Sequence, residues 1–359
     1  TDLPPLSEFY EYLTELWESS WITNDGTLLK SLESELRKFL HFENLLVVSN
    51  GTQALQIALK SLKIKGEVIT TPFTFAATTN AIIWEGITPV FADIDPETYN
   101  IDPKDVKRKI TDKTSAILAV HVYGNPCYVE ELQTIADDNG LALIYDAAHA
   151  FGVEYKDNPI LNYGDISTLS FHATKLFNTG EGGAITVNDP DLFEKIRLMR
   201  NHGIKSEDEV ICLGTNAKMS EIHAALGLCN LKHVKHNILI RRKIYECYKM
   251  GLSEVESITF QDVVASNYNY SYMPVCFENR KMRDELYSEL LRSGVKSRKY
   301  FYPLTSTFEY VNTVTGSSEL TIAHNIADRI LCLPLYPNLE MDEVIKIIDL
   351  IKKKSIKVY

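Results

Sequence analysis

The chain has 359 residues, of which 45% are apolar, so its length suggests about two globular domains, one of them with a large core. Its 37 basic and 48 acidic residues give a formal net charge of −11, which argues against a nucleic-acid partner and implies that any bound anion needs a local site. No apolar run reaches the roughly 18 residues that span a bilayer, so we expect no membrane partner.

The N-terminal part of the chain predicts two helices and a turn. Residues 1–5 have neither the basic nor the apolar region of a secretory signal peptide, and we expect a cytoplasmic protein. Apolar residues recur at helical spacing over residues 8–17 and again over residues 28–40. The segment between them, residues 23–26, predicts a turn.

Seven short apolar or β-branched runs then alternate with amphipathic stretches, as in parallel strands joined by crossover helices. The predicted strands cover residues 45–49, 67–71, 89–93, 115–121, 141–146, 168–171 and 184–187. We expect an α/β domain with one seven-stranded, mostly parallel sheet and helices on both faces. Because ligands bind at the carboxyl ends of the strands in such sheets, the functional residues are expected there.

The last third of the chain predicts a smaller α+β domain. A long basic helix over residues 220–250 leads away from the sheet, and residues 268–277 predict a strand. Residues 281–292 and 341–354 predict two further helices. We place the domain boundary near residue 240, which divides the chain into residues 1–240 and 241–359, although no Gly/Ser/Pro linker marks it.

Neither the cysteines nor a pair of histidines predicts a metal site. The six cysteines lie far apart without a C-x-x-C motif, and we interpret them as reduced thiols. His233 and His236 lie one helical turn apart, but no third ligand accompanies them. We therefore expect a solvated basic helix face and no metal.

Three segments are candidates for a functional site, and two of them come at the end of a predicted strand or directly after it. Residues 49–52 open a predicted helix over residues 53–62, so their N–H groups favour an anion, and an ordinary N-cap by Asn50 or Thr52 is the alternative. Asp146 ends a strongly apolar strand and is followed by small residues. A carboxylate there can bind a metal, orient a histidine or pair with a protonated ring nitrogen; the alternative is that Asp146 caps a helix that starts at Ala147.

Lys175 is the third candidate, because it lies between apolar residues and precedes a glycine-rich turn. Such a lysine is either a surface side chain with a buried stem or a desolvated amine suited to Schiff-base chemistry. The turn over residues 180–183 matches neither the dinucleotide-binding G-x-G-x-x-G pattern nor a P-loop.

Taken together, these segments resemble the DegT/DnrJ/EryC1 family of nucleotide-sugar aminotransferases, which are pyridoxal 5′-phosphate (PLP) enzymes of fold type I, the aspartate aminotransferase-like fold. The resemblance covers nearly the whole chain. It is carried by residues 23–26, 49–52, 71–78, 93–95, 121–124, 146–149, 170–183, 200–203 and 214–221.

The resemblance implies roles for three catalytic residues. Lys175 matches the family lysine that holds PLP covalently and then moves a proton between the donor and cofactor carbons. Asp146 would pair with the pyridine nitrogen and keep it protonated. His149, at a position that is often glutamine in the family, would hydrogen-bond near the phenolic oxygen; a packed histidine is the alternative.

The resemblance also implies how the cofactor is held. Gly51, Thr52 and Ser170 would donate to the phosphate, and Asn216 would reach it from a second subunit, so that a homodimer shares two active sites. Phe75 would lie against the cofactor ring, whereas Phe73 belongs to the core.

Family members mostly aminate nucleotide-linked keto sugars with glutamate as the amino donor. Residues 3–10 and 66–75 are most similar to members that act on dTDP-4-keto-6-deoxyglucose, so we expect amination at C4 in bacterial surface-sugar biosynthesis, such as that of lipopolysaccharide or O-antigen. The alternative is C3 amination of a dTDP-3-keto-6-deoxyhexose.

Thr305 stands where the family commonly has histidine. A nearby cluster is either a pyrophosphate and base site or a solvated loop: Lys296, Arg298, Lys299, Tyr300 and Tyr302.

Two further alternatives have different sequence marks. A sugar 3-dehydratase of this fold has histidine in place of the lysine, whereas Lys175 is present here. A binding or regulatory protein that had lost catalysis would show decay of Lys175, Asp146 or the Gly51–Thr52 turn, and all are intact.

Overall fold

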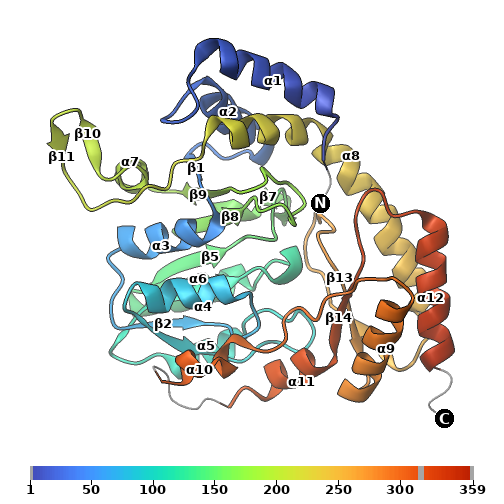
Figure 1. Ribbon diagram of the computed structural model, residues 1–359. Helices are drawn as coiled ribbons and strands as arrows, with labels where there is room; N and C mark the ends of the chain where they lie inside the picture. The colour runs from blue at the N-terminus through green and yellow to red at the C-terminus, as the bar shows by residue number, and fades with distance from the viewer. Residues whose placement is uncertain (1–2, 314–318, 356–359) are drawn as a thin grey trace.

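The computed structural model describes residues 3–313 and 319–355, and its centre is a seven-stranded sheet (Figure 1). The strand order is β1-β9-β8-β5-β4-β2-β3. β9 runs antiparallel to both of its neighbours, and the other pairs are parallel. The predicted sheet is therefore confirmed. Its strands are β1 (Leu45–Val48), β2 (Glu67–Thr70), β3 (Thr88–Phe91), β4 (Thr114–Val120), β5 (Ala142–Asp146), β8 (Ile166–Ser170) and β9 (Gly183–Val187).

Helices cover both faces of the sheet, which explains why its strands are continuously apolar. In β1, Leu45 and Val47 belong to one hydrophobic cluster and Leu46 and Val48 to the other, because successive side chains point to opposite faces. One face packs against α3 (Gly51–Ser61), α4 (Ala76–Trp84) and α7 (Pro190–Arg200). The other packs against α2 (Thr27–Leu40), α5 (Pro103–Lys109) and α6 (Val129–Asn139).

The N-terminal helices lie beside the start of the longest helix. α1 (Leu6–Ser19) and α2 both contact α8 (Glu221–Leu252), the long yellow helix that runs below α1 toward the right of Figure 1. These three helices and α3 correspond to the segments predicted at residues 8–17, 28–40, 220–250 and 53–62. No helix in the described part of the chain is long and apolar enough to cross a bilayer.

The C-terminal part is a small antiparallel sheet with helices. It contains β12 (Ile258–Phe260), β13 (Met273–Phe277) and β14 (Ile330–Leu333), packed with α9 (Arg280–Arg292), α11 (Thr321–Arg329) and α12 (Met341–Ser355). The strand predicted over residues 268–277 was too long. Tyr270 has a φ of +52°, and the Asn269 amide bonds to the carbonyls of His149 and Phe151, so extended pairing begins only at Met273.

The proposed division near residue 240 stays a prediction, and α8 runs unbroken across that position. Two side chains of α8, Val234 and Ile238, pack in the core of the large sheet, whereas Ile244 and Tyr248 pack in the C-terminal core. This change of partners supports the division. Residues 1–2, 314–318 and 356–359, which the two predicted domains include, lie outside the described residues.

Short elements complete the fold. The hairpin of β10 (Ile204–Ser206) and β11 (Glu209–Val210) projects from the body of the molecule at the left of Figure 1. The remaining elements are β6 (Glu154–Tyr155), β7 (Asn158–Pro159), α10 (Glu309–Asn312) and the 3₁₀ turns at Val122–Gly124, Ile160–Asn162 and Thr305–Thr307.

Candidate functional site

A cavity of about 360 Å³ lies at the carboxyl ends of the central strands. Val120, Asp146 and Ser170, the last residues of β4, β5 and β8, all line it. This is the position expected for a ligand in a parallel sheet. The rest of the lining comes from the start of α3, from the connection before α4, from the turn after β8, and from residues 272–301 of the C-terminal part.

Asp146 presents a buried carboxylate to this cavity. Thr78 donates a hydrogen bond of 2.7 Å to Oδ2, and the N–H of Ala148 donates one of 3.1 Å to Oδ1. Burial raises the pKa of Asp146, while these two bonds and the Lys175 ammonium oppose that shift. No helix begins at Ala147, so the helix-cap alternative is wrong; the Ala148 contact belongs to a turn.

Lys175 lies in the turn after β8 and lines the same cavity. Its side chain is partly buried, and burial lowers the pKa of its amine to about 8, with the Asp146 carboxylate acting in the opposite direction. A snorkelling surface lysine would keep an ordinary pKa, so the structure favours the desolvated amine. Near neutral pH a usable fraction of this amine is unprotonated.

The start of α3 forms an anion cradle beside Ser170. Asn50 is the N-cap and accepts from the N–H of Gln53 at 2.9 Å, so the predicted cap is present. The N–H groups of Gly51 and Thr52 belong to the first helical turn, where no intrahelical acceptor exists. A Cβ at Gly51 would lie 2.9 Å from the Ser170 Cβ, so only glycine lets the helix end approach this strand so closely.

His149 is buried between aromatic rings at the edge of the cavity. Its ring stacks with Phe301 at 5.8 Å and lies 4.8 Å from the ring of Tyr272. The N–H of Tyr123 donates to Nδ1 at 3.2 Å, and burial holds the pKa of His149 well below its usual value. The ring is therefore neutral, and Nε2 carries the proton and is a donor.

The two phenylalanines of the β2–α4 connection have different positions. Phe73 is fully buried among aromatic residues, as predicted. Phe75 lines the cavity and is 57% exposed, which leaves its ring face available to a flat ligand.

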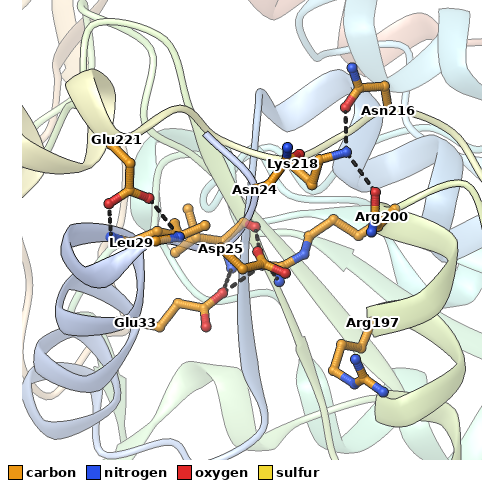
Figure 2. A network of polar contacts seen from close by, with 12 residues as sticks. Asn24, Asp25, Leu29, Glu33, Arg197, Arg200, Asn216, Lys218 and Glu221 are labelled. Atoms are coloured by element: carbon orange, nitrogen blue, oxygen red, sulfur yellow. Dashed lines mark hydrogen bonds and ion pairs between the residues drawn. The ribbon is translucent and has the colours of Figure 1, made fainter. Parts of the chain in front are cut away.

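Asn216 does not line the cavity within this chain. Its Oδ1 accepts a 3.0 Å hydrogen bond from Lys218, and its side chain is exposed (Figure 2). The expectation that it reaches the site of a second subunit stays a prediction.

The segments 23–26, 200–203 and 214–221 meet in one polar network, which Figure 2 shows. Glu221 accepts from the N–H groups of Gly26 at 3.0 Å and Leu28 at 2.8 Å, and so caps α2. Arg200 pairs with Glu33 at 2.6 Å and with Asp25 at 2.9 Å. These contacts fasten the N-terminal helices to the sheet.

The predicted cluster at residues 296–302 is divided between two places. Arg298 and Tyr300 line the main cavity and also an adjoining groove, whereas Lys296, Lys299 and Tyr302 line the groove and not the cavity. Lys299 pairs with Asp284. Thr305 is fully buried and bonds to Thr79 at 2.8 Å and to the Pro72 carbonyl at 3.2 Å, and it is not among the residues that line the cavity.

Sequence reasoning missed Thr78, Tyr272 and Phe301. Thr78 lies within a motif that carried the resemblance, but only the fold brings it to Asp146, 68 positions away. Tyr272 and Phe301 come from the C-terminal part, and neither is among the residues that the sequence singled out there. His233, which was expected on a solvated face, bonds to Glu8 at 3.0 Å.

These residues fit PLP. The cradle that a Cβ at Gly51 would fill offers neutral donors for a phosphate, and the buried Asp146 carboxylate forms no ion pair among the described residues, so it can take a ring N–H⁺. The neutral His149 donor and the Lys175 amine line the same space.

Comparisons with known proteins agree with this geometry. The model of the DegT/DnrJ/EryC1/StrS aminotransferase family matches residues 6–352. The chain is 44% identical over 360 residues to dTDP-4-amino-4,6-dideoxy-D-glucose transaminase of Escherichia coli, covering 98% of this chain and 96% of that one.

Two solved structures have the same fold. DesI, in a crystal structure obtained in the presence of its TDP-sugar product, has a TM-score of 0.93 and 33% identity, over 99% of this chain and 94% of that chain. NtdA of Bacillus subtilis with bound cofactor PMP has a TM-score of 0.91 and 27% identity, over 98% and 82%.

Proposed function

Because the chain belongs to the DegT/DnrJ/EryC1/StrS aminotransferase family, we propose that it transfers an amino group from glutamate to C4 of a dTDP-linked 4-keto-6-deoxyhexose. The observation that carries the proposal is the meeting of the Lys175 amine and the Asp146 carboxylate in one cavity at the sheet edge. The family depends on PLP, and we propose PLP as the cofactor of this chain.

Each polar residue of the cavity has a task in this reaction. When bound, PLP draws in the electron pair that is left on the amino-bearing carbon as its proton departs. Lys175 would hold the cofactor and, once released, its amine would move that proton between the donor carbon and the cofactor carbon. Asp146 holds a proton on the ring nitrogen, and the His149 Nε2–H donates to the phenolic oxygen. Gly51, Thr52 and Ser170 hold the phosphate.

The substrate proposal has two supports. The transaminase of Escherichia coli is named for a dTDP-linked 4-amino sugar, and DesI was crystallised with a TDP-sugar product. In this chain Arg298 lines both the cavity and the adjoining groove, so it offers a cation where a diphosphate would leave the cavity. No observation favours C3 amination. A role in bacterial surface-sugar biosynthesis and a cytoplasmic location stay predictions.

We propose a homodimer in which each chain completes the site of the other. Asn216 lies at the base of the β10–β11 hairpin, outside the cavity of its own chain. Val210, the last residue of β11, and Leu213 just after it are 68% and 70% exposed, so two apolar side chains close in sequence are open to solvent here. Contact with a second copy would bury them.

The function is tested by giving the enzyme, PLP and glutamate a panel of nucleotide keto sugars. We expect amination of the dTDP-linked 4-keto-6-deoxyhexose, with formation of 2-oxoglutarate, and mass and NMR coupling constants identify the aminated carbon. An amine at C3, or turnover only with another nucleotide, would contradict the proposed substrate. Bound PLP without turnover of any sugar would contradict the reaction.

A further inference from the structure

We propose that Lys218 is a positioning residue, which fixes the direction of the Asn216 side-chain amide so that its Nδ2 is presented to the phosphate in the partner subunit's site. This inference rests on the proposed function, since it requires that Asn216 reach the cofactor of a second chain.

The geometry of the two side chains carries the proposal. Lys218 Nζ donates a hydrogen bond of 3.0 Å to Asn216 Oδ1 (Figure 2) and one of 2.6 Å to Asn201 Oδ1. An ammonium group has only donors, so it must meet the oxygen of the Asn216 amide and not the nitrogen. The two N–H bonds of Nδ2 are thereby left on the side away from Lys218. Without this contact the amide could turn its oxygen toward the anion, and holding it in the donor orientation would cost side-chain entropy.

The backbone next to Lys218 is held by hydrogen bonds. Asn201 and Asn216 form a backbone bridge, and the N–H of Ala217 bonds to the Arg200 carbonyl at 3.0 Å. Gln53 Nε2 also donates to the Asn216 carbonyl at 3.4 Å. Because the backbone of Asn216 is fixed in this way, the remaining freedom lies in its side chain, and Lys218 removes it.

Within the part of the chain that the structure describes, Lys218 contacts neutral side chains and no carboxylate, as a residue that positions an amide would. Both of its hydrogen bonds go to neutral amide oxygens, and it forms no ion pair within residues 3–313 and 319–355. Its ammonium charge is therefore not cancelled by a contacting carboxylate. Asp25 is the nearby acidic group, and it pairs with Arg200 at 2.9 Å. A positive charge behind the amide also makes that amide a stronger donor to an anion.

A double-mutant cycle on PLP affinity tests the proposal. The dissociation constant of PLP is measured by absorbance titration for wild type, Asn216→Ala, Lys218→Met, the double variant and Lys218→Arg, with Lys205→Met as the control. Lys205 is an exposed lysine of the neighbouring β10–β11 hairpin, paired with Glu209 at 3.1 Å. Size-exclusion chromatography and thermal melting verify that each variant keeps its assembly and its fold.

We expect Lys218→Met to raise the dissociation constant of PLP about fivefold or more. This is the effect of losing one hydrogen bond to an anion. Lys218→Arg restores binding to within about twofold, because guanidinium is also a pure donor. The Lys218→Met change has no further effect when Asn216 is already alanine, and Lys205→Met has none at all.

Three results would overturn the inference. One is an unchanged PLP affinity in Lys218→Met while Asn216→Ala weakens it. Another is an additive loss in the double variant, which would mean that Lys218 acts without Asn216. The last is an Asn216→Ala variant that binds PLP normally, which would also refute the shared site. Failure of the wild type to bind PLP at all would instead refute the proposed function.

Discussion

The hydroxyl of Thr78, in the first turn of α4, donates a 2.7 Å hydrogen bond to Oδ2 of Asp146 at the end of β5. Together with the N–H of Ala148 it gives this buried carboxylate two donors. Because burial alone raises the pKa of Asp146, these donors favour the charged form that can pair with a ring N–H⁺.

Asp146→Asn is expected to lower kcat by about 10³-fold, because a neutral amide cannot keep the ring nitrogen protonated. Loss of a single electrostatic partner has effects of this size in other enzymes. Thr78→Val leaves the Ala148 donor in place and is expected to cost about tenfold at most. Steady-state kinetics with glutamate give both values. Unchanged turnover in Asp146→Asn would show that another group protonates the ring.

The rate at which PLP becomes attached to the cofactor-free protein should rise with pH and level off above about pH 8. Burial lowers the pKa of Lys175 to about 8, and only the neutral amine attacks the aldehyde. Stopped-flow absorbance between pH 6 and about 11 measures the midpoint. Borohydride reduction should then label the peptide that contains Lys175. A midpoint near 10.5, the value of an ordinary lysine, or label on another lysine, would contradict the assignment.

Lys175→Met is expected to stabilise the cofactor-free protein at pH 7 by about 2 kcal/mol, because the wild type must keep a partly desolvated ammonium there. The folded pKa of about 8 is below the ordinary 10.5. Between these values the unfolded chain binds more protons, so the wild-type free energy of unfolding rises with pH. The advantage of Lys175→Met should therefore shrink from pH 8 to 10.5 in urea titrations. Lys30→Met, at an exposed position, is the control.

Glu221→Ala should lower the free energy of unfolding by about 2 kcal/mol, because the N–H groups of Gly26, Leu28 and Leu29 lose their shared acceptor. Proteolysis should also cut the α1–α2 region sooner. Glu256→Ala, an exposed glutamate, is the matched control. Equal melting temperatures of the two variants would mean that this cap contributes nothing.

When PLP is limiting, mixed subunits of Lys175→Ala, which is inactive, and Asn216→Ala, which binds PLP weakly, should be more active than either variant alone. Lys175→Ala lacks the amine, and Asn216→Ala lacks the residue that we propose to reach across. A dimer with one chain of each kind contains one complete site, made from Lys175 of one chain and Asn216 of the other. Activity should therefore increase after joint refolding. If Asn216 acted within its own chain, no mixed dimer would have a complete site, and the mixture would stay no more active than its parts.

The sequence predicts the central sheet well, because the strands buried on both faces are short apolar runs between clear turn signals. The limits of β1, β2 and β5 differ from the predicted ones by only one residue. It could not reveal that β9 is reversed, since strand direction depends on the connection and not on the composition. The strand expected from residue 268 failed because the Asn269 side chain and the positive φ of Tyr270 draw the chain inward.

In the candidate site, too, some residues could be predicted from the sequence and others could not. Lys175, Asp146 and the Gly51 turn were predicted from ordered motifs, and the fold brings them to one cavity. Tyr272 and Phe301 could not be predicted, because the packing of the C-terminal part against the sheet, with Phe301 stacked on His149, decides their place.

The lining of the cavity has two origins in the chain, and this makes the protein suited to grafting. The cofactor end comes from residues 50–181, and the outer wall comes from residues 272–301. A chimera that takes the outer wall from a relative with another sugar preference would leave the Asp146 and Lys175 end untouched. At the seam, the contact of Tyr123 with the Tyr300 carbonyl would have to be matched, and so would the ring contacts that Phe301 and Tyr272 make with Phe73, Tyr123 and His149.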